Sequence, residues 1–198
     1  KAKTMTLTDT FKSVRRAAGT LADMTDDERN AVLADVADAI VAGKERLLAA
    51  NGADLARMDK ANPLYDRLRL TAERLDAIAA DMRNVALLPS PLGRTSHDRT
   101  LPNGLHIRRV SVPFGVIGIV YEARPNVTFD VFALCFKSGS ACILKGGKDA
   151  DSSNREGVAL IHEALQRHGV DTAAVQLLPS THEATAEMLE IGRASCRE

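Results

Sequence analysis

The sequence predicts an α/β protein in which helices come first, a hairpin arm follows, and a parallel sheet with crossover helices comes last. Three observations predict this class. Over residues 1–88, apolar residues recur at the spacing of amphipathic helices. Over residues 92–112, a strong turn signal separates two short stretches of strand character. After residue 112, short apolar runs alternate with helical segments, which is typical of parallel strands joined by right-handed crossovers.

Two threonines mark helix starts in the first part of the chain. Thr25 precedes the acidic run Asp26–Glu28, and acidic side chains suit the positive end of a helix. Thr71 is placed to cap a later helix. The prolines at Pro89 and Pro91 then end the helical part, because proline cannot continue a helix.

The hairpin arm is predicted at about 95–112. Asn103-Gly104 is a strong signal for a tight hairpin turn. The following stretch, Leu105–Val112, alternates imperfectly between apolar and polar residues. Two strands alone are marginally stable in water. We therefore expect the arm to pair with another part of the protein or with another subunit.

The first strand of the sheet is predicted at Val116–Val120, a short apolar run that we expect to be covered on both faces. Pro125 biases Arg124 away from helical geometry. Asn126 follows, and Val127–Lys137 is long enough for a helix. A helix that begins directly after a central strand is a common position for binding anions and placing reaction donors.

The same alternation continues to the end of the predicted fold. A second strand is predicted at Ser140–Lys145, closed by Gly146-Gly147, and a helix at Asp151–His168. A third strand, Ala174–Leu178, precedes a helical Glu183–Leu189. Ligands bind at the carboxyl ends of strands in open α/β sheets, so this edge is where a site is expected.

Composition excludes several classes of function. Acidic and basic residues number 26 each, and this balance favours neither a nucleic-acid partner nor an anionic membrane surface. No apolar run approaches the ~20 residues of a membrane span, and no signal peptide opens the chain. The three cysteines lack the spacing of a disulfide framework or a zinc site. We expect a reduced, cytoplasmic protein without a metal.

Several segments together resemble the gamma-glutamyl phosphate reductase family, whose other name is glutamate-5-semialdehyde dehydrogenase. They are LYDRLRLTAERLDAIAADMRNVALLPSPLG, RTLPNGLHIRRVSVPFGV, VPFGVIGIVYEARPNVT, LCFKSGSACILKGG, the Ser153-Asn154 pair and VQLLPST. The resemblance covers roughly residues 10–189. Within the aldehyde dehydrogenase superfamily, YEARPN and LKGG are specific to this branch, since ordinary aldehyde dehydrogenases carry Pro-Trp-Asn there.

The resemblance implies a Rossmann-like sheet of the aldehyde dehydrogenase fold and an NADPH-dependent reduction of gamma-glutamyl phosphate in proline biosynthesis. In that family a cysteine thiolate displaces phosphate, hydride reduces the resulting thioester, and the enzyme is a homo-oligomer. The nucleophilic cysteine lies downstream of this chain's last residue. We therefore expect residues 1–189 to be the N-terminal part of an NADP-binding domain, without the catalytic domain and inactive alone.

The resemblance assigns the sharpest role to Asn126. It matches the asparagine that donates its amide to the developing oxyanion, where a neutral donor fixed at a helix start suits charge that appears only in the transition state. The alternative is a plain helix N-cap. Lys145 falls where superfamily members hold the adenosine ribose, and a cation there would suit the 2′-phosphate of NADPH. Its alternative is a solvated lysine at a strand end.

Three further residues are candidates with structural alternatives. Gly146 and Gly147 would let the backbone approach the cofactor, or they simply make the turn. Arg124 suits a phosphate or carboxylate of the substrate. A structural ion pair with Glu122 would explain this arginine equally well.

The remaining reactive side chains carry less information. Cys135 and Cys142 lie in apolar segments and are expected to be inert core residues, and His162 and His168 are expected on a solvated helix face. Residues 191–198 lack the preceding periodicity, and residues 190–198 back-translate to a common sequencing adaptor. We therefore expect a non-native tail in which residues 191–198 pack against nothing; the alternative is a natural, divergent C-terminus. Two other functions stay open: another NAD(P)-dependent aldehyde or acyl dehydrogenase, or a non-catalytic nucleotide-binding or interaction module.

Overall fold

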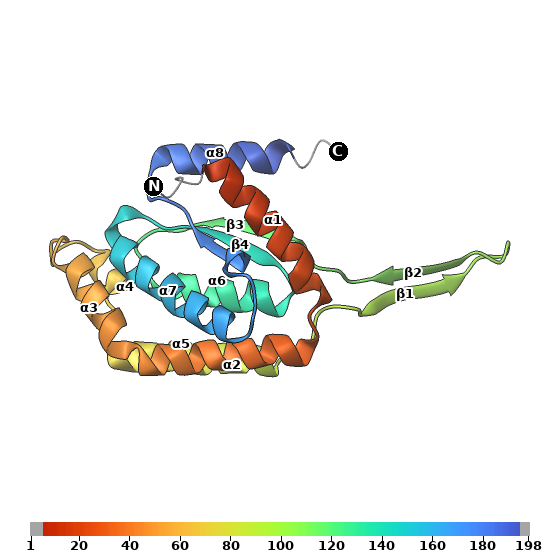
Figure 1. Cartoon of the computed structure of the whole chain (residues 1–198), viewed down its shortest axis with the longest axis horizontal. Helices are drawn as coiled ribbons and strands as arrows, with labels where there is room; N and C mark the ends of the chain where they lie inside the picture. Colours follow the sequence, from red (N-terminus) through yellow and green to blue (C-terminus); the bar gives the residue numbers. More distant parts are fainter. Residues whose placement is uncertain (1–5, 195–198) are drawn as a thin grey trace.

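The computed structural model describes residues 6–194, and its elements follow the predicted order (Figure 1). The first five helices are α1 (Leu7–Asp23), α2 (Asp26–Ala42), α3 (Lys44–Leu55), α4 (Tyr65–Leu68) and α5 (Ala72–Leu87). The hairpin strands are β1 (Thr95–Thr100) and β2 (His106–Val110). The last part contains β3 (Val116–Val120), α6 (Asn126–Lys137), β4 (Ala141–Lys145), α7 (Asp151–Arg167), β5 (Val175–Leu177) and α8 (His182–Ala194), with short 3-10 turns at Lys148–Ala150 and Thr172–Ala174. The predicted α/β class is confirmed.

The sheet is parallel, with the strand order β3-β4-β5. Its middle strand, β4, is buried along its whole length and packs against both α1 and α6. In Figure 1, α6 and α7 lie between the sheet and a further layer formed by α2 and α5. No helix in the 6–194 stretch is long and apolar enough to cross a membrane.

The expectation that the first strand is covered on both faces was wrong. β3 is the edge strand of the described sheet, and its residues are partly exposed, with Val120 at 49%. An apolar run indicates burial of the strand centre but does not say which strand stands at the edge. Part of its cover comes from α8, since the Met188 sulfur lies 3.2 Å from the point where a Cβ on Gly118 would stand.

The capping signals of the helical part are confirmed. The Thr25 hydroxyl accepts from the Glu28 backbone N–H at 3.2 Å, and the Thr25 N–H donates to the Glu28 carboxylate at 2.7 Å. This reciprocal arrangement is a capping box, which satisfies two helix-end donors at once. The Thr71 hydroxyl likewise accepts from the Arg74 backbone N–H at 3.2 Å at the start of α5.

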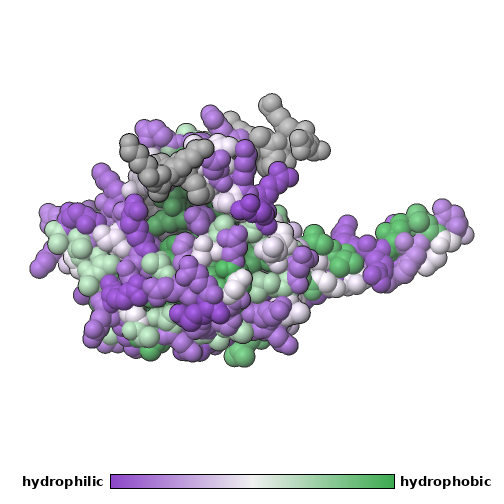
Figure 2. All heavy atoms as spheres, in the orientation of Figure 1, coloured by the Kyte–Doolittle hydropathy of each residue, from purple (hydrophilic) through white to green (hydrophobic). Residues whose placement is uncertain are grey.

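The hairpin arm forms as an antiparallel pair that stands clear of the body of the protein (Figures 1 and 2). Every residue of β1 is exposed, and Gly104 occupies the left-handed region at φ 86° in the connecting turn. Apolar side chains are also exposed on and beside β2, namely Leu105, Val110 and Val112. The expected pairing of the arm with another surface stays a prediction.

A buried carboxylate holds the start of α7. That helix has no capping side chain of its own. Asp54, at the end of α3 and 0% exposed, instead accepts hydrogen bonds from the backbone N–H groups of Ser152 and Ser153 at 3.1 and 2.8 Å, and from the Ser153 hydroxyl at 2.6 Å. A negative charge at a helix N-terminus is stabilised by the helix dipole and by these donors.

A neighbouring buried amide extends this network to the segment before α5. The Asn51 side chain donates to the Leu68 carbonyl at 2.9 Å and to the Ser153 hydroxyl at 3.1 Å, and it accepts from the Leu70 N–H at 2.8 Å. The backbone of residues 68–70 is therefore tied to the start of α7. We refer to Asn51, Asp54 and Ser153 as the polar anchor.

Two sequence expectations concern the end of the chain and the histidines. Helix α8 continues through Ala194, while residues 195–198 lie outside the described residues, so the packing of the 190–198 tail stays a prediction. His168 is exposed as expected. The expectation for His162 was wrong, because its ring lies 2.8 Å from the Val175 carbonyl oxygen and is partly buried.

The polar anchor generates a stability prediction. Asp54→Ala would leave the buried donors of Ser152 and Ser153 without an acceptor, so the free energy of unfolding should fall by about 2–4 kcal/mol. The control is Asp38→Ala, which removes the exposed ion pair with Arg83 and should cost at most about 1 kcal/mol. Urea unfolding of the chain measures both, and similar losses would contradict a special role for Asp54.

Candidate functional site

The carboxyl ends of β3 and β4 bring the two predicted site segments together. Val120 and Lys145 are paired in register at this edge, and the Tyr121 N–H donates to the Lys145 carbonyl at 3.1 Å. The bend after β3 therefore starts beside the turn after β4. A Cβ on Gly147 would lie 3.5 Å from the Glu122 Cα. This is the edge at which the sequence predicts ligand binding.

The bend between β3 and α6 is conformationally unusual. Ala123 has a φ of 39°, in the left-handed region that non-glycine residues rarely adopt, and its side chain is buried. Pro125 then occupies the N-cap position of α6. Strained backbone persists only where the surroundings enforce it, and it concentrates at functional sites. The strain here sets the directions in which Arg124 and Asn126 leave the bend.

Asn126 is the first residue of α6, and its side chain does not cap the helix. The N-cap residue is Pro125, with no side-chain capping bond. The Asn126 amide instead donates to the Asp130 carboxylate, one turn further along, at 3.1 Å. The alternative of a plain N-cap was therefore wrong. Because an amide nitrogen carries two hydrogens, one remains to donate elsewhere while Asp130 holds the group in position.

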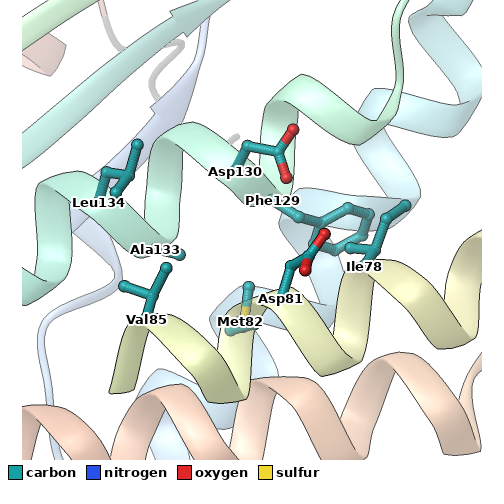
Figure 3. Close-up of a pocket in the computed structure, with 8 residues that line it drawn as sticks. All are labelled: Ile78, Asp81, Met82, Val85, Phe129, Asp130, Ala133 and Leu134. Carbon is teal, nitrogen blue, oxygen red and sulfur yellow. The ribbon is translucent and has the colours of Figure 1, made fainter. Parts of the chain in front are cut away.

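Asp130 lies at the opening of a groove between α5 and α6 (Figure 3). The groove has a volume of about 210 Å³, and its walls are apolar apart from Asp130 and Asp81, which face it from the two helices. Burial raises the pKa of Asp130, the Asn126 amide opposes that rise, and the charge of Asp81 adds to it. The amide of Asn126 is thus a neutral hydrogen-bond partner for an exposed carboxylate at the edge of this groove.

A second pocket has a volume of about 370 Å³, and Asn126 is one of the residues that line it. Its lining residues come from the segment around α4, from α5 and from the bend: Asp66, Arg67, Arg69, Leu70, Arg74, Ala77, Ile78, Arg124 and Asn126. The lining thus contains four arginines and one aspartate. Sequence reasoning missed the three arginines of the 66–74 segment, although their density in YDRLRLTAER was a signal. Their distance along the chain from Asn126 hid the connection.

Arg124 lines this arginine-rich pocket and is exposed. Among the residues that the structure describes, it forms no ion pair with Glu122 or with any other carboxylate. The structural alternative for Arg124 therefore has no support in the structure. A guanidinium without a carboxylate partner beside Asn126 is free to bind an anion.

Lys145 lies outside the arginine-rich pocket, at the end of β4. The residue is 8% exposed, so most of its side chain is buried. Its ammonium nitrogen is not among the buried polar atoms that lack a partner, so the charged end reaches solvent. Within residues 6–194 this group has neither an ion-pair nor a hydrogen-bond partner. An ammonium without a carboxylate partner at a strand end is available to an anionic ligand.

The two glycines after Lys145 differ in how much space surrounds them. A Cβ on Gly146 would lie 2.2 Å from the Asn154 amide nitrogen, which leaves no room for a side chain. Asn154 is held there because the Thr128 hydroxyl donates to its oxygen at 3.1 Å, and Thr128 in turn lies 2.7 Å from the Tyr121 hydroxyl. A Cβ on Gly147 would meet only ordinary contacts.

This hydrogen-bonded chain leaves one buried donor unused. Asn154 is 1% exposed, and its amide nitrogen has no partner among the described residues. Burial raises the pKa of Tyr121 to about 12, despite the hydrogen bond with Thr128, so the phenol stays neutral and can donate. The turn at Gly146-Gly147 thus lies between a buried, unpartnered amide and a lysine that has no ion-pair partner among the described residues.

The two described cysteines are buried, as the sequence predicts. Cys135 lies in α6 and Cys142 in β4. Interaction with the Cys142 thiol lowers the pKa of Cys135, while the same interaction and burial raise the pKa of Cys142. Neither sulfur is available as a nucleophile at the carboxyl edge of the sheet.

Comparison with solved structures first defines the class of protein. The acetylating aldehyde dehydrogenase from Geobacillus thermoglucosidasius superposes with a TM-score of 0.69 over 92% of this chain and 38% of that one. The sequence identity is 16%, a level at which the likeness establishes the fold alone. The chain has part of the aldehyde dehydrogenase fold, as predicted.

Sequence similarity then singles out one group within that fold. A gamma-glutamyl phosphate reductase from Bacteroides thetaiotaomicron is 58% identical over 186 residues, 94% of this chain and 45% of the relative. The gamma-glutamyl phosphate reductase crystal structure from Thermotoga maritima has a TM-score of 0.87 and 33% identity, over 92% of this chain and 45% of that chain. No family model matches. The chain is homologous to gamma-glutamyl phosphate reductases, and it spans about 45% of the length of these relatives.

The difference between the two glycines can be tested on the chain itself. Gly146→Ala must displace the buried Asn154 amide, so the free energy of unfolding should fall by about 1–3 kcal/mol. Gly147→Ala is the matched control. It meets no close contact at φ −74° and ψ 160°, and its effect should stay within about 0.5 kcal/mol. Urea unfolding checks both changes, and an unaffected Gly146→Ala chain would disprove the steric argument.

Proposed function

We propose that this chain is part of an NADPH-dependent reductase that converts gamma-glutamyl phosphate to glutamate-5-semialdehyde in proline biosynthesis. The observation that carries the proposal is 58% identity to a gamma-glutamyl phosphate reductase across 94% of the chain. The arrangement of Asn126 beside an arginine-rich pocket supports it, because both the phosphate and the carboxylate of such a substrate are anionic.

In the proposed reaction, Asn126 stabilises the oxygen of the attacked acyl group. Negative charge develops on that oxygen only as the reaction proceeds, and a preorganised neutral donor lowers the barrier without reorganisation. The hydrogen bond to Asp130 supplies the preorganisation. Arg124, two residues earlier on the bend, binds an anionic group of the substrate. Neither described cysteine can supply the attacking thiolate, because Cys135 and Cys142 are both buried, and Cys196 lies outside the described residues. We place the thiolate in further sequence of the protein, so the chain alone should be inactive.

The turn after β4 is suited to a nicotinamide dinucleotide. Such a cofactor would supply the hydride and needs a cation for its phosphate, open backbone, and polar donors at its edge. We assign the cation to Lys145 and the backbone approach to Gly146 and Gly147, of which Gly147 has the more open surroundings. The buried amide of Asn154 packs against Gly146 and supports the turn from behind. The ammonium of Lys145 would bind the 2′-phosphate, and this contact would favour NADPH over NADH.

The wider organisation of the protein follows from the same proposal. Residues up to 189 would form the N-terminal part of the NADP-binding domain, with the catalytic domain supplied by further sequence. The exposed hairpin arm, about 95–112, would pair with a second subunit of a homo-oligomer, which would cover its apolar side chains. The cytoplasm is the proposed compartment.

The proposed activity is testable in a full-length chimera. In this protein, the matching segment of the Bacteroides thetaiotaomicron reductase is replaced by this chain. The chimera should catalyse phosphate-dependent oxidation of glutamate-5-semialdehyde with NADP, whereas the 198-residue chain should not. A folded chimera without activity would count against the proposed function, with the unaltered relative as the positive control.

Lys145 should contribute to cofactor choice. A well-made contact between a lysine and a phosphate is charge-assisted and contributes about 1.5–3 kcal/mol. Lys145→Ala in the chimera should therefore weaken NADPH binding about 10- to 100-fold and leave NADH binding little changed. Lys148→Ala, at an exposed lysine of the same turn, is the control for general charge. Isothermal titration calorimetry measures the affinity of the chimera and its variants for NADPH and for NADH. If Lys145→Ala weakened the binding of both cofactors equally, Lys145 would not bind the 2′-phosphate.

Asn126 should matter for turnover and little for folding. Asn126→Ala in the chimera should lower kcat by about 10²–10³, the usual loss for one oxyanion donor. Since Asn126 does not cap α6, the melting temperature should barely change. Asp130→Ala removes only the partner that orients the amide, so its kcat should fall less. Unchanged turnover of the Asn126→Ala enzyme would exclude the oxyanion role.

A further inference from the structure

Two of the four arginines in the arginine-rich pocket, Arg69 and Arg74, are paired with a carboxylate, and the other two are not. Asp66 pairs with Arg69 at 3.3 Å and with Arg74 at 3.1 Å. Arg74 also donates to the backbone carbonyls of Asp66 and Arg69 at 2.7 and 2.6 Å. These two arginines therefore hold the wall of the pocket together, and the single carboxylate of the pocket is already shared between them.

Arg67 and Arg124 carry the unbalanced charge. Both line the pocket, both are exposed, and neither has a carboxylate partner among the residues described here. They approach from different sides, Arg67 from the helix α4 and Arg124 from the bend before α6. Two guanidiniums around one cavity form a site for an anion, and their planar forks suit a carboxylate in particular.

The backbone that carries Arg67 is held firmly. Leu68 is buried, and its carbonyl accepts from Asn51, whose oxygen in turn accepts from the Leu70 N–H. Arg67 thus extends from a segment fixed by the polar anchor rather than from a free loop. Preorganised charges lose less entropy on binding than mobile ones, which favours a specific ligand subsite over a loose patch of positive charge.

We propose that this pocket binds the α-carboxylate of the substrate's amino-acid end, with Arg67 as the residue that recognises it. The assignment rests on the proposed function, which places the acyl group at Asn126. The phosphate is attached to that same acyl carbon, so it must stay close to Asn126 and to Arg124 on the same bend. The α-carboxylate lies a full glutamyl side chain away, so we assign it to Arg67, the guanidinium without a carboxylate partner that comes from α4 and not from the bend.

If Arg67 binds the α-carboxylate, the enzyme selects substrates that carry a negative charge at the end remote from the reacting acyl group. An aldehyde that lacks the α-carboxylate gains nothing from Arg67 and leaves the guanidinium uncompensated. Arg67 is accordingly a specificity-determining residue. It should affect how well the carboxylated substrate binds and leave the chemical step at Asn126 unchanged, because its assigned partner is the α-carboxylate and not the oxygen on which charge develops.

The test compares two substrates in the chimera. Arg67→Gln should raise KM for glutamate-5-semialdehyde about 10- to 100-fold, the usual effect of losing one charge-assisted contact, with kcat little changed. The KM for 4-aminobutanal, which lacks only the α-carboxylate, should stay the same. Arg67→Lys should restore part of the loss. The matched control, Arg16→Gln at an exposed position of α1, should change neither KM. Equal changes for both substrates, or none for either, would overturn the proposal.

A binding measurement on the 198-residue chain keeps the subsite testable if the chimera is inactive, an outcome that would count against the proposed function alone. L-Norvaline carries the α-carboxylate without any acyl phosphate. It should shift the NMR signals of residues 66–74 and 124–126, and Arg67→Gln should abolish the shifts. Binding of inorganic phosphate without L-norvaline, or of neither, would overturn the carboxylate assignment.

Discussion

The polar anchor of Asn51, Asp54 and Ser153 is the constraint on which both parts of the candidate site depend. Buried polar groups are costly when unpaired, so a satisfied network has essentially one geometry. Asp54 fixes the start of α7, and the next residue of that helix, Asn154, stands directly against Gly146. Asn51 fixes residues 68–70 beside the arginine-rich pocket. One network thus holds both the turn at Gly146-Gly147 and the wall of the arginine-rich pocket.

A second buried charge fixes the helix that carries Asn126. Lys137, at the far end of α6, donates to the Asp26 carboxylate, to the Asn30 side chain and to the Ala86 carbonyl at 3.1, 2.6 and 3.1 Å. Burial alone would raise the pKa of Asp26, but the hydrogen bond and charge of Lys137 outweigh it, and the pKa is lowered. The axis of α6 is therefore locked to α2 and α5, which leaves the first turn of α6 to project Asn126 into the pocket.

Short sequence patterns predicted the helices and strands well. The site, in contrast, depends on contacts between residues far apart in the sequence, which such patterns do not reveal. Periodicity and caps located the helices, and the strand-bend-helix pattern located Asn126 at the carboxyl edge of the sheet. The exposure of Val120 was missed because strand order is a tertiary property. The burial of Lys145 was missed for the same reason. Arg67 lies far along the chain from Asn126, and only the anchoring of residues 68–70 by Asn51 brings it to the pocket.

The separation between anchor and site has a consequence for how substitutions combine. Arg67, Asn126 and Lys145 stand on three different segments and share no hydrogen bond with one another in the described part of the chain, so their effects should add independently. The anchor residues are in mutual contact and support several segments at once, so their effects should be strongly coupled. A protein built in this way can change a cofactor or substrate contact by a single substitution without moving the others. Changing the anchor would disturb the turn after Lys145 and the position of Arg67 together, because the same buried groups hold the turn at Gly146 and the segment that carries Arg67.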